Sequence, residues 1–133
     1  IKDATGNMGR CFDLLCRVPK DFAVYSGDDA SSLALLLQGG HGTISVTANV
    51  APKLVHEMCV AVFAGEVTTA CSINARLLRL HFDLFVEANP IPVKWAVAQM
   101  GLMETGLRLP LTNLSEEHHE LVRDAMIQAE VQL

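Results

Sequence analysis

The sequence of 133 residues predicts an α/β fold, in which a short parallel sheet precedes a tail of helices. Two strand-helix-strand patterns in succession predict the sheet, because a helix is the usual connection between parallel neighbours. Beyond residue 50 the strand patterns stop, and helical patterns continue towards the end of the chain. Hydrophobic residues make up 50% of the sequence and charged residues 19%, which is typical of a well-buried domain.

The first crossover starts at Ile1 and Lys2, where the chain opens in the pattern of a strand. Residues 7–17 carry apolar side chains at helical spacing, and Pro19 ends that helix. Residues 22–25 form a short, nearly apolar run, as a strand buried on both faces of a parallel sheet does. These three segments predict one complete strand-helix-strand unit.

The second crossover passes through a short helical pattern at residues 30–37, which Gly39 and Gly40 terminate. Residues 43–47 follow and are rich in β-branched side chains, so they predict the third strand. Both units are roughly twenty residues long, which indicates βα modules rather than the repeats of a solenoid.

The tail is predicted to contain four helices, at residues 52–64, 68–86, 92–100 and 116–131. Gly65 and Gly101 follow the first and third of them, and Ser115 is the expected N-cap of the last. His81 lies on the apolar stripe of the second helix, where we expect a packed histidine with satisfied hydrogen bonds rather than a ligand.

Charge and cysteine content argue against several classes of function. The formal net charge is −5, and the mixed charges form no basic stripe of the kind that binds nucleic acid. No apolar run is long enough to span a membrane, and no secretion signal is seen. The cysteines form no C-x-x-C pair, so we expect buried thiols in a reducing cytoplasm and neither a metal site nor disulfides: Cys11, Cys16, Cys59 and Cys71.

Four sequence blocks are distinctive in this chain, namely Ile1–Asn7, Val24–Asp29, Gly39–Pro52 and Asn89–Ala96. Together they resemble the dihydrodipicolinate synthase family of pyruvate-condensing lyases, and the resemblance runs along the whole chain. Sialic acid lyases and keto-deoxy sugar aldolases share the lysine-bearing strand but lack the Ser-Gly-Asp-Asp and Ser-Val-Thr-Ala-Asn forms. They remain an alternative within the same superfamily.

The resemblance implies a TIM barrel, or (β/α)8 barrel, which needs roughly 250 residues. We therefore expect this chain to be the carboxyl-terminal part of such a barrel. Residues 1–65 would supply the last three βα units, and residues 66–133 a carboxyl-terminal helical extension of the same single-domain enzyme. As a fragment, the chain is expected to have almost no activity alone.

Lys2 is the expected catalytic residue. A lysine attacks a ketone only as the neutral amine, and an ordinary pKa of about 10.4 leaves well under roughly 1% of that form at pH 7. Burial or nearby positive charge must therefore favour the neutral amine. The resemblance implies that Lys2 forms a Schiff base with pyruvate, and that the enamine then attacks aspartate semialdehyde without a cofactor or metal. It also implies a homo-oligomer, commonly a tetramer.

Gly27 and Ile44 are the expected substrate-binding residues. At the end of its strand, a Cβ at Gly27 would crowd the pocket. In the family the isoleucine that matches Ile44 presents its backbone carbonyl at the pyruvate site, although a simple core position is an equal alternative.

Asp28 and Asp29 are more typical of a helix cap and a first-turn charge than of a metal or acid-base pair. Residues 39–42 precede a strand, which argues against a phosphate cradle.

The family's tyrosine-centred proton relay, its keto-acid loop and its arginine for the aldehyde have no match in this chain. The resemblance places them in the earlier half of the barrel, and Tyr25, the only tyrosine, lies inside a strand. A third possibility therefore stays open, a non-catalytic half-barrel that assembles through unpaired strand edges.

Overall fold

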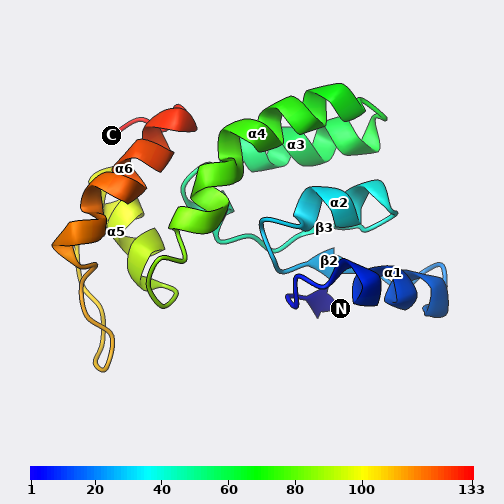
Figure 1. Ribbon diagram of the computed structural model, residues 1–133, viewed down its shortest axis with the longest axis horizontal. Coiled ribbons are helices and arrows are strands. Elements are labelled where there is room, and N and C mark those ends of the chain that lie inside the picture. The colour runs from blue at the N-terminus through cyan, green and yellow to red at the C-terminus, as the bar shows by residue number, and fades with distance from the viewer.

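The computed structural model describes the whole chain, residues 1–133, as a small parallel sheet with its helices and a larger set of packed helices (Figure 1). The prediction of a parallel sheet with two helical crossovers is confirmed. The sheet has the order β1-β2-β3, and its elements are β1 (Lys2–Asp3), α1 (Met8–Arg17), β2 (Tyr25–Ser26), α2 (Ser32–Leu37) and β3 (Gly42–Thr43).

The strands are in register with one another. Asp3 pairs with Ser26, which pairs in turn with Thr43, and Lys2 pairs with Tyr25 one residue earlier. Each strand is two residues long, so the strand predicted at 22–25 is displaced towards its carboxyl end. A sheet this small has little stability of its own and depends on the helices packed against it.

The third strand ends earlier than the sequence predicts. In place of a strand through Thr47, the chain leaves the sheet at Thr43 and forms the 3-10 helix η1 (Thr47–Asn49). The cause is Asp29, because its Oδ2 accepts the backbone N–H groups of Val46 at 2.9 Å and Thr47 at 3.0 Å. Donors held by a carboxylate are not available to a strand ladder, so the chain turns here.

The helical tail follows the prediction with shifts at the ends. Helix α4 ends at Asp83 rather than Val86, and the last helix starts as a 3-10 turn and ends at Gln128. Ser115 precedes that turn without a side-chain capping bond. The elements are α3 (Pro52–Phe63), α4 (Val67–Asp83), α5 (Ile91–Gln99), η2 (Glu116–His118) and α6 (His119–Gln128).

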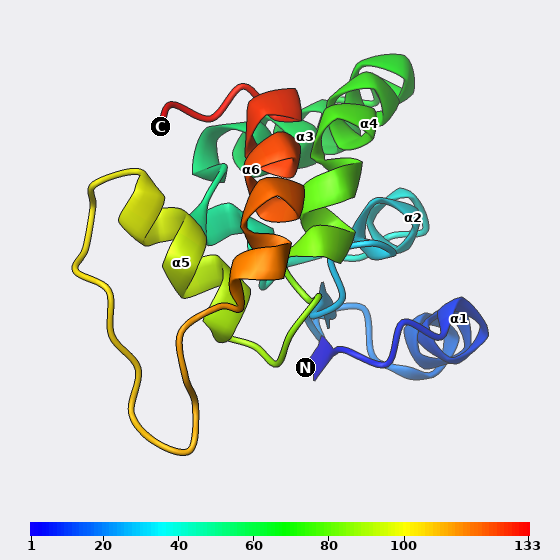
Figure 2. The same ribbon diagram turned by 60° about the vertical axis from the view of Figure 1, so that its left-hand side comes forward.

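Helices α3 and α4 form a hairpin, and both views show them side by side (Figures 1 and 2). Gly65 makes the turn with φ at +77°, a conformation that a residue with a Cβ adopts only at a cost. The N–H of Gly65 donates to Val62 O, and the N–H of Glu66 donates to Ala61 O. These two bonds satisfy carbonyls at the end of α3, as a glycine stop does.

One hydrophobic core joins the helices from α2 to α6 and continues across Gly65. Its side chains include several with no exposed surface, among them Met58, Leu77, Leu80, Val122 and Met126. Helix α1 packs instead on a small separate cluster formed by Cys11, Val24 and Leu35. Residues 1–65 and 66–133 therefore share their main core.

The cysteines depart in part from the prediction. All four are free thiols, and Cys11 is buried, as expected. Cys59 is half-buried, whereas Cys16 and Cys71 are exposed. The prediction of buried thiols is wrong for these last two, because they lie on the solvent-facing sides of α1 and α4.

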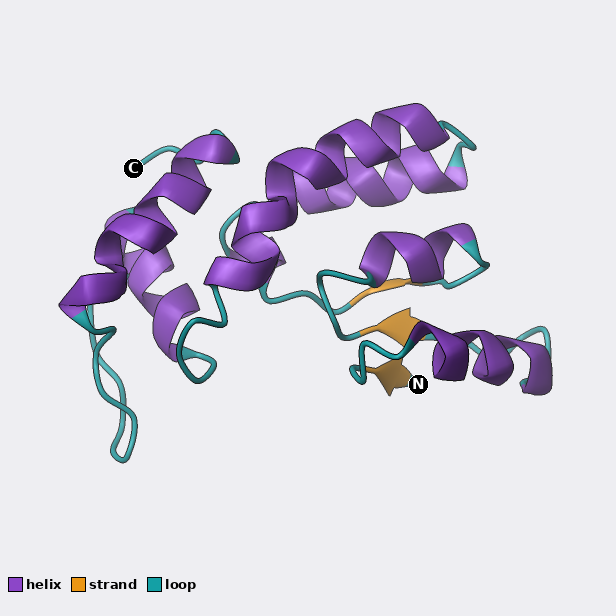
Figure 3. Cartoon of the chain, in the orientation of Figure 1, coloured by secondary structure: helices purple, strands orange, loops and turns teal.

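A long loop connects α5 to η2 and stands away from the helices (Figure 3). Leu102 and Leu109 in this loop are 69% and 86% exposed. The helices of this structure include none with both the length and the apolar character that crossing a lipid bilayer requires.

The packing predicts a sharp contrast between two adjacent leucines. Leu77→Ala removes a side chain with 0% exposure and should cost about 2–5 kcal/mol of unfolding free energy. Leu78→Ala is the matched control, because Leu78 is 41% exposed, and it should cost under about 1 kcal/mol. Chemical denaturation of both variants measures the difference, and equal costs would contradict this core.

Candidate active site

The parallel register brings the three residues selected from the sequence to one edge of the sheet. Lys2 lies in β1, Gly27 directly follows β2, and Ile44 directly follows β3. The N–H of Gly27 donates to Asp3 O at 2.7 Å, and the N–H of Ile44 donates to Ser26 O at 2.8 Å. The carboxyl ends of the strands thus gather these residues where α/β proteins bind their ligands.

Gly27 packs directly against the Lys2 side chain. A Cβ added to Gly27 would overlap Lys2 Cε and would lie 2.8 Å from both Lys2 Cγ and Ala4 Cβ. A side chain at this position would therefore clash first with Lys2. The absence of a side chain at Gly27 makes the space in which Lys2 lies.

Lys2 and its neighbour Asp3 point to opposite sides of β1, as strand alternation predicts. Lys2 is exposed, whereas Asp3 is only 5% exposed. Asp3 accepts the Thr5 hydroxyl at 2.6 Å, the Thr5 N–H at 2.9 Å and Arg10 Nε at 3.0 Å. The Thr5 bonds hold the pKa of Asp3 below its usual range, with a smaller contribution from Arg10 and partial opposition from burial.

Ile44 does not lie in the core. Its side chain is 50% exposed, which argues against the simple core position. Its N–H is bound to the sheet, whereas its carbonyl oxygen accepts no hydrogen bond from within the chain. An unpaired carbonyl at the edge that carries Lys2 is an acceptor that a ligand can use.

The two aspartates have different tasks. Asp28 accepts the Ser31 N–H at 3.0 Å and the Ser31 hydroxyl at 2.5 Å, so it stabilises the turn before α2. The capping interpretation holds for it only in this looser sense, because the N-cap of α2 is Ser31. That interpretation is wrong for Asp29, which binds the backbone of Val46 and Thr47 across the sheet. Sequence spacing gives no sign of this contact, since its partners lie 17 and 18 residues away.

His81 is a packed histidine, as the sequence predicts, but only one of its nitrogens is satisfied. It is 3% exposed, its Nδ1 lies 2.9 Å from Thr47 Oγ1, and its Nε2 has no partner. Burial lowers the pKa of His81, and the charges of Asp29 and Asp28 oppose that shift only in part. The ring is therefore neutral at pH 7.

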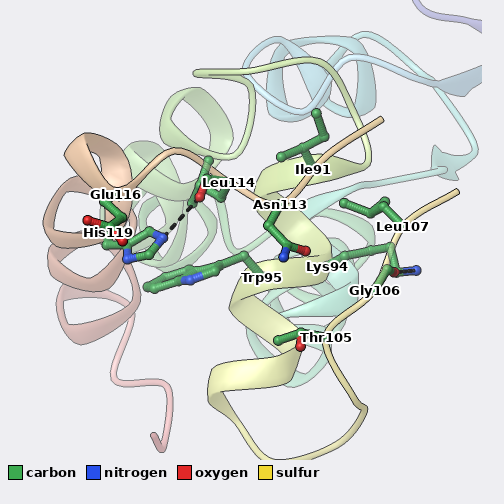
Figure 4. A pocket seen from close by; sticks show the side chains of 10 residues that line it. All are labelled: Ile91, Lys94, Trp95, Thr105, Gly106, Leu107, Asn113, Leu114, Glu116 and His119. Carbon is green, nitrogen blue, oxygen red and sulfur yellow. Dashed lines mark hydrogen bonds between the residues drawn. The ribbon is translucent and has the colours of Figure 1, made fainter. Parts of the chain in front are cut away.

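A second feature escaped the sequence analysis, a cavity of about 260 Å³ between α5, the long loop and α6 (Figure 4). Trp95 stacks on His119 with ring centroids 4.7 Å apart, and Arg123 lies 5.7 Å from the Trp95 ring. Lys94 Nζ donates to Gly106 O at 2.5 Å across the cavity. Lys2, Gly27 and Ile44 do not line it.

No cluster of three histidine, cysteine, aspartate or glutamate side chains within residues 1–133 is arranged to hold a metal ion. The sheet edge instead offers the Lys2 amine and the unpaired Ile44 carbonyl, while the nearby Asp28 carboxylate is already bonded to Ser31. This arrangement is suited to covalent capture of a carbonyl compound by the amine.

Comparison with protein families matches residues 1–129 to the model described as the dihydrodipicolinate synthetase family. Two similar curated proteins are both called 4-hydroxy-tetrahydrodipicolinate synthase. The one from Nitrosospira multiformis is 71% identical over 133 residues, which are 100% of this chain and 44% of that protein. The one from Nitrosomonas europaea is 73% identical over 129 residues, 97% of this chain and 44% of that protein. The chain thus spans under half of these relatives.

Solved structures agree with this similarity. Dihydrodipicolinate synthase from Acinetobacter baumannii, solved in complex with pyruvate, matches with a TM-score of 0.95 and 47% sequence identity. The match covers 99% of this chain and 45% of the Acinetobacter chain. Dihydrodipicolinate synthase from Aquifex aeolicus matches with a TM-score of 0.94 and 38% sequence identity, over 99% of this chain and 45% of the Aquifex chain.

The contact between Gly27 and Lys2 predicts a coupled pair of substitutions. Gly27→Ala should destabilise the chain by about 1–3 kcal/mol, because the new methyl group overlaps the lysine side chain. In the double variant with Lys2→Ala, part of that cost should disappear, with a coupling energy above about 0.5 kcal/mol. Gly9→Ala in α1 is the control, since its Cβ meets only Asn7 Oδ1 at 3.4 Å. Strict additivity in chemical denaturation would contradict the contact.

The bonds of Asp3 predict a pH-dependent contribution to stability. Because the folded pKa is depressed below 3.8, the stabilisation is present above pH 3.8 and is lost as the pH falls through the lower, folded value. Asp3→Asn should therefore cost about 1–3 kcal/mol at pH 7 and less at pH 3. Denaturation at the two pH values tests this. A cost independent of pH would show that the charge contributes nothing.

Proposed function

The chain belongs to the dihydrodipicolinate synthetase family, and we propose that it is the carboxyl-terminal half of a lyase that condenses pyruvate with aspartate semialdehyde. The observation that carries this proposal is the parallel register, which sets Lys2, Gly27 and Ile44 at one edge of the sheet. The name shared by its relatives, 4-hydroxy-tetrahydrodipicolinate synthase, supports the reaction.

In the proposed reaction, Lys2 Nζ attacks the keto carbon of pyruvate, and loss of water gives an imine. Removal of a proton from the adjacent methyl group gives the enamine, whose carbon attacks the aldehyde of aspartate semialdehyde. The amine of that substrate then displaces Lys2 by transimination, which closes the ring and returns the free lysine.

Gly27 and Ile44 would serve this chemistry without side-chain functional groups. Gly27 leaves the space that the Lys2 side chain occupies. The Ile44 carbonyl, which has no partner within the chain, would accept a hydrogen bond from the hydroxyl that forms when the amine adds to the ketone. The lysine is exposed here, so the water exclusion that favours its neutral amine would come from the rest of the complete enzyme.

The outer edges of β1 and β3 are unpaired, and we propose that the remaining strands of a TIM barrel pair with them in the complete enzyme. Residues 1–65 would be its last βα units and residues 66–133 its helical extension. The core shared across Gly65 supports the folding of both regions as one unit. For the complete enzyme we propose a cytoplasmic homo-oligomer, commonly a tetramer, while the 133 residues alone should be almost inactive.

The open strand edges also favour a second candidate, a non-catalytic module that assembles through β1 or β3. Such a module would bind a partner strand and would have no need of a reactive lysine. A sialic acid lyase or sugar-acid aldolase, the other alternative, would use the lysine but would prefer a different aldehyde.

Trapping with borohydride tests the proposal on a complete chain, in which these 133 residues replace the matching segment of the Nitrosospira multiformis protein. Incubation with pyruvate and borohydride should give one pyruvyl adduct per chain, and peptide analysis should place it on Lys2. The adduct should disappear in Lys2→Ala and persist in Lys20→Ala, which removes another lysine of the same chain.

Substrate competition then separates the enzymatic candidates. Aspartate semialdehyde should protect the imine from reduction by drawing it into product, whereas N-acetylmannosamine should not. A folded chimera that forms no adduct would favour the assembly module, and selective turnover of the sugar aldehyde would favour the sialic acid lyase.

A further inference from the structure

Three buried polar side chains link α4 to the edge of the sheet. Asp29 is 3% exposed, Thr47 is 0% exposed and His81 is 3% exposed, and they come from the segment after β2, from η1 and from α4. Buried polar groups cost free energy unless they are paired, so their contacts constrain the segments that carry them.

The first contact fixes the chain just beyond Ile44. Asp29 Oδ2 holds the N–H groups of Val46 and Thr47, while the Ile44 N–H is held by Ser26 O in the sheet. The Ile44 carbonyl thus lies between two anchored points of the backbone. Its direction depends on both anchors.

The second contact fixes the far end of this turn. The Thr47 hydroxyl has His81 as its only partner, with 2.9 Å between Oγ1 and Nδ1. If the hydroxyl donates to Nδ1, the one buried donor left over is the N–H at Nε2. If Nδ1–H donated instead, the hydroxyl hydrogen and the Nε2 lone pair would both lack partners. The arrangement that leaves fewer hydrogen-bonding groups unpaired is a neutral ring that carries its proton on Nε2 and accepts at Nδ1.

We propose that Thr47 and His81 are positioning residues, which hold the Ile44 carbonyl at the pyruvate site through the turn bound by Asp29. This inference rests on the proposed function, because it assigns a task to the surroundings of the Lys2 site. Neither residue touches the reacting atoms. It also gives the helical tail a role in the reaction, since His81 lies in α4, beyond Gly65.

Matched pairs of variants in the same full-length chimera test the proposal by steady-state kinetics. Thr47→Val keeps the branched shape without the hydroxyl, and His81→Leu removes the nitrogen. Each should lower kcat/KM for pyruvate about tenfold and leave kcat/KM for aspartate semialdehyde within about twofold, because the Ile44 hydrogen bond forms only as the amine adds to the ketone. Thr47→Ser and His81→Asn keep a polar atom near the same place and should recover most of the loss. The double variant Thr47→Val with His81→Leu should be no worse than either single one.

The outcomes separate this inference from the proposed function. An unsubstituted chimera that forms no pyruvyl adduct would overturn both. Normal trapping, with both kcat/KM values unchanged or lowered equally, or with no recovery in Thr47→Ser and His81→Asn, would overturn only the positioning role.

A spectroscopic measurement keeps the test independent of how the variants fold. The ¹⁵N shifts of the His81 ring in the unsubstituted chimera should show a protonated Nε2 and an accepting Nδ1 at pH 7. The Thr47→Val variant should shift the Nδ1 resonance. A ring protonated on Nδ1 would contradict the arrangement on which the inference depends.

Discussion

The hydrogen-bonded register of three very short parallel strands determines which side chains meet at the edge of the sheet. Two backbone hydrogen bonds, from Gly27 N–H to Asp3 O and from Ile44 N–H to Ser26 O, extend this pairing beyond the strands. They place the segments after β2 and β3 beside Lys2. A slip by one residue would turn Lys2 to the buried side and Asp3 to the open edge, since alternate side chains face opposite ways. The site is therefore a property of backbone pairing more than of side-chain contacts.

Such a small sheet cannot hold its register alone, and the surrounding polar contacts explain why it is stable. The Asp3 carboxylate binds the start of the first crossover, and Asp29 binds the turn that follows β3. The apolar core then joins this turn to the helical tail, because Val50 and Ala51 pack with residues of α3 and α4. The sheet edge and the tail form one structural unit, and a change in either is expected to reach the other.

The sequence predicted most of the fold, because helical spacing, glycine stops and β-branched runs are local signals. It also selected Lys2 and Gly27 from strand-end placement and chemistry, whereas the role of Ile44 came only from the resemblance to a family. It failed where a distant side chain overrides a local preference. Residues 43–47 have the composition of a strand, but the carboxylate of Asp29 takes the donors of Val46 and Thr47. The stacking of Trp95 on His119 likewise joins residues whose spacing carries no signal.

We propose that Lys2 becomes the pyruvate-binding residue once the barrel is complete. The most direct measurement is a crystal structure of the full-length chimera after reduction with borohydride in the presence of pyruvate. We expect continuous density from Lys2 Nζ to the former keto carbon, with Gly27 against the lysine side chain and the Ile44 carbonyl facing the adduct. Density on another lysine, or an adduct pointing away from the carboxyl edge of the sheet, would contradict it.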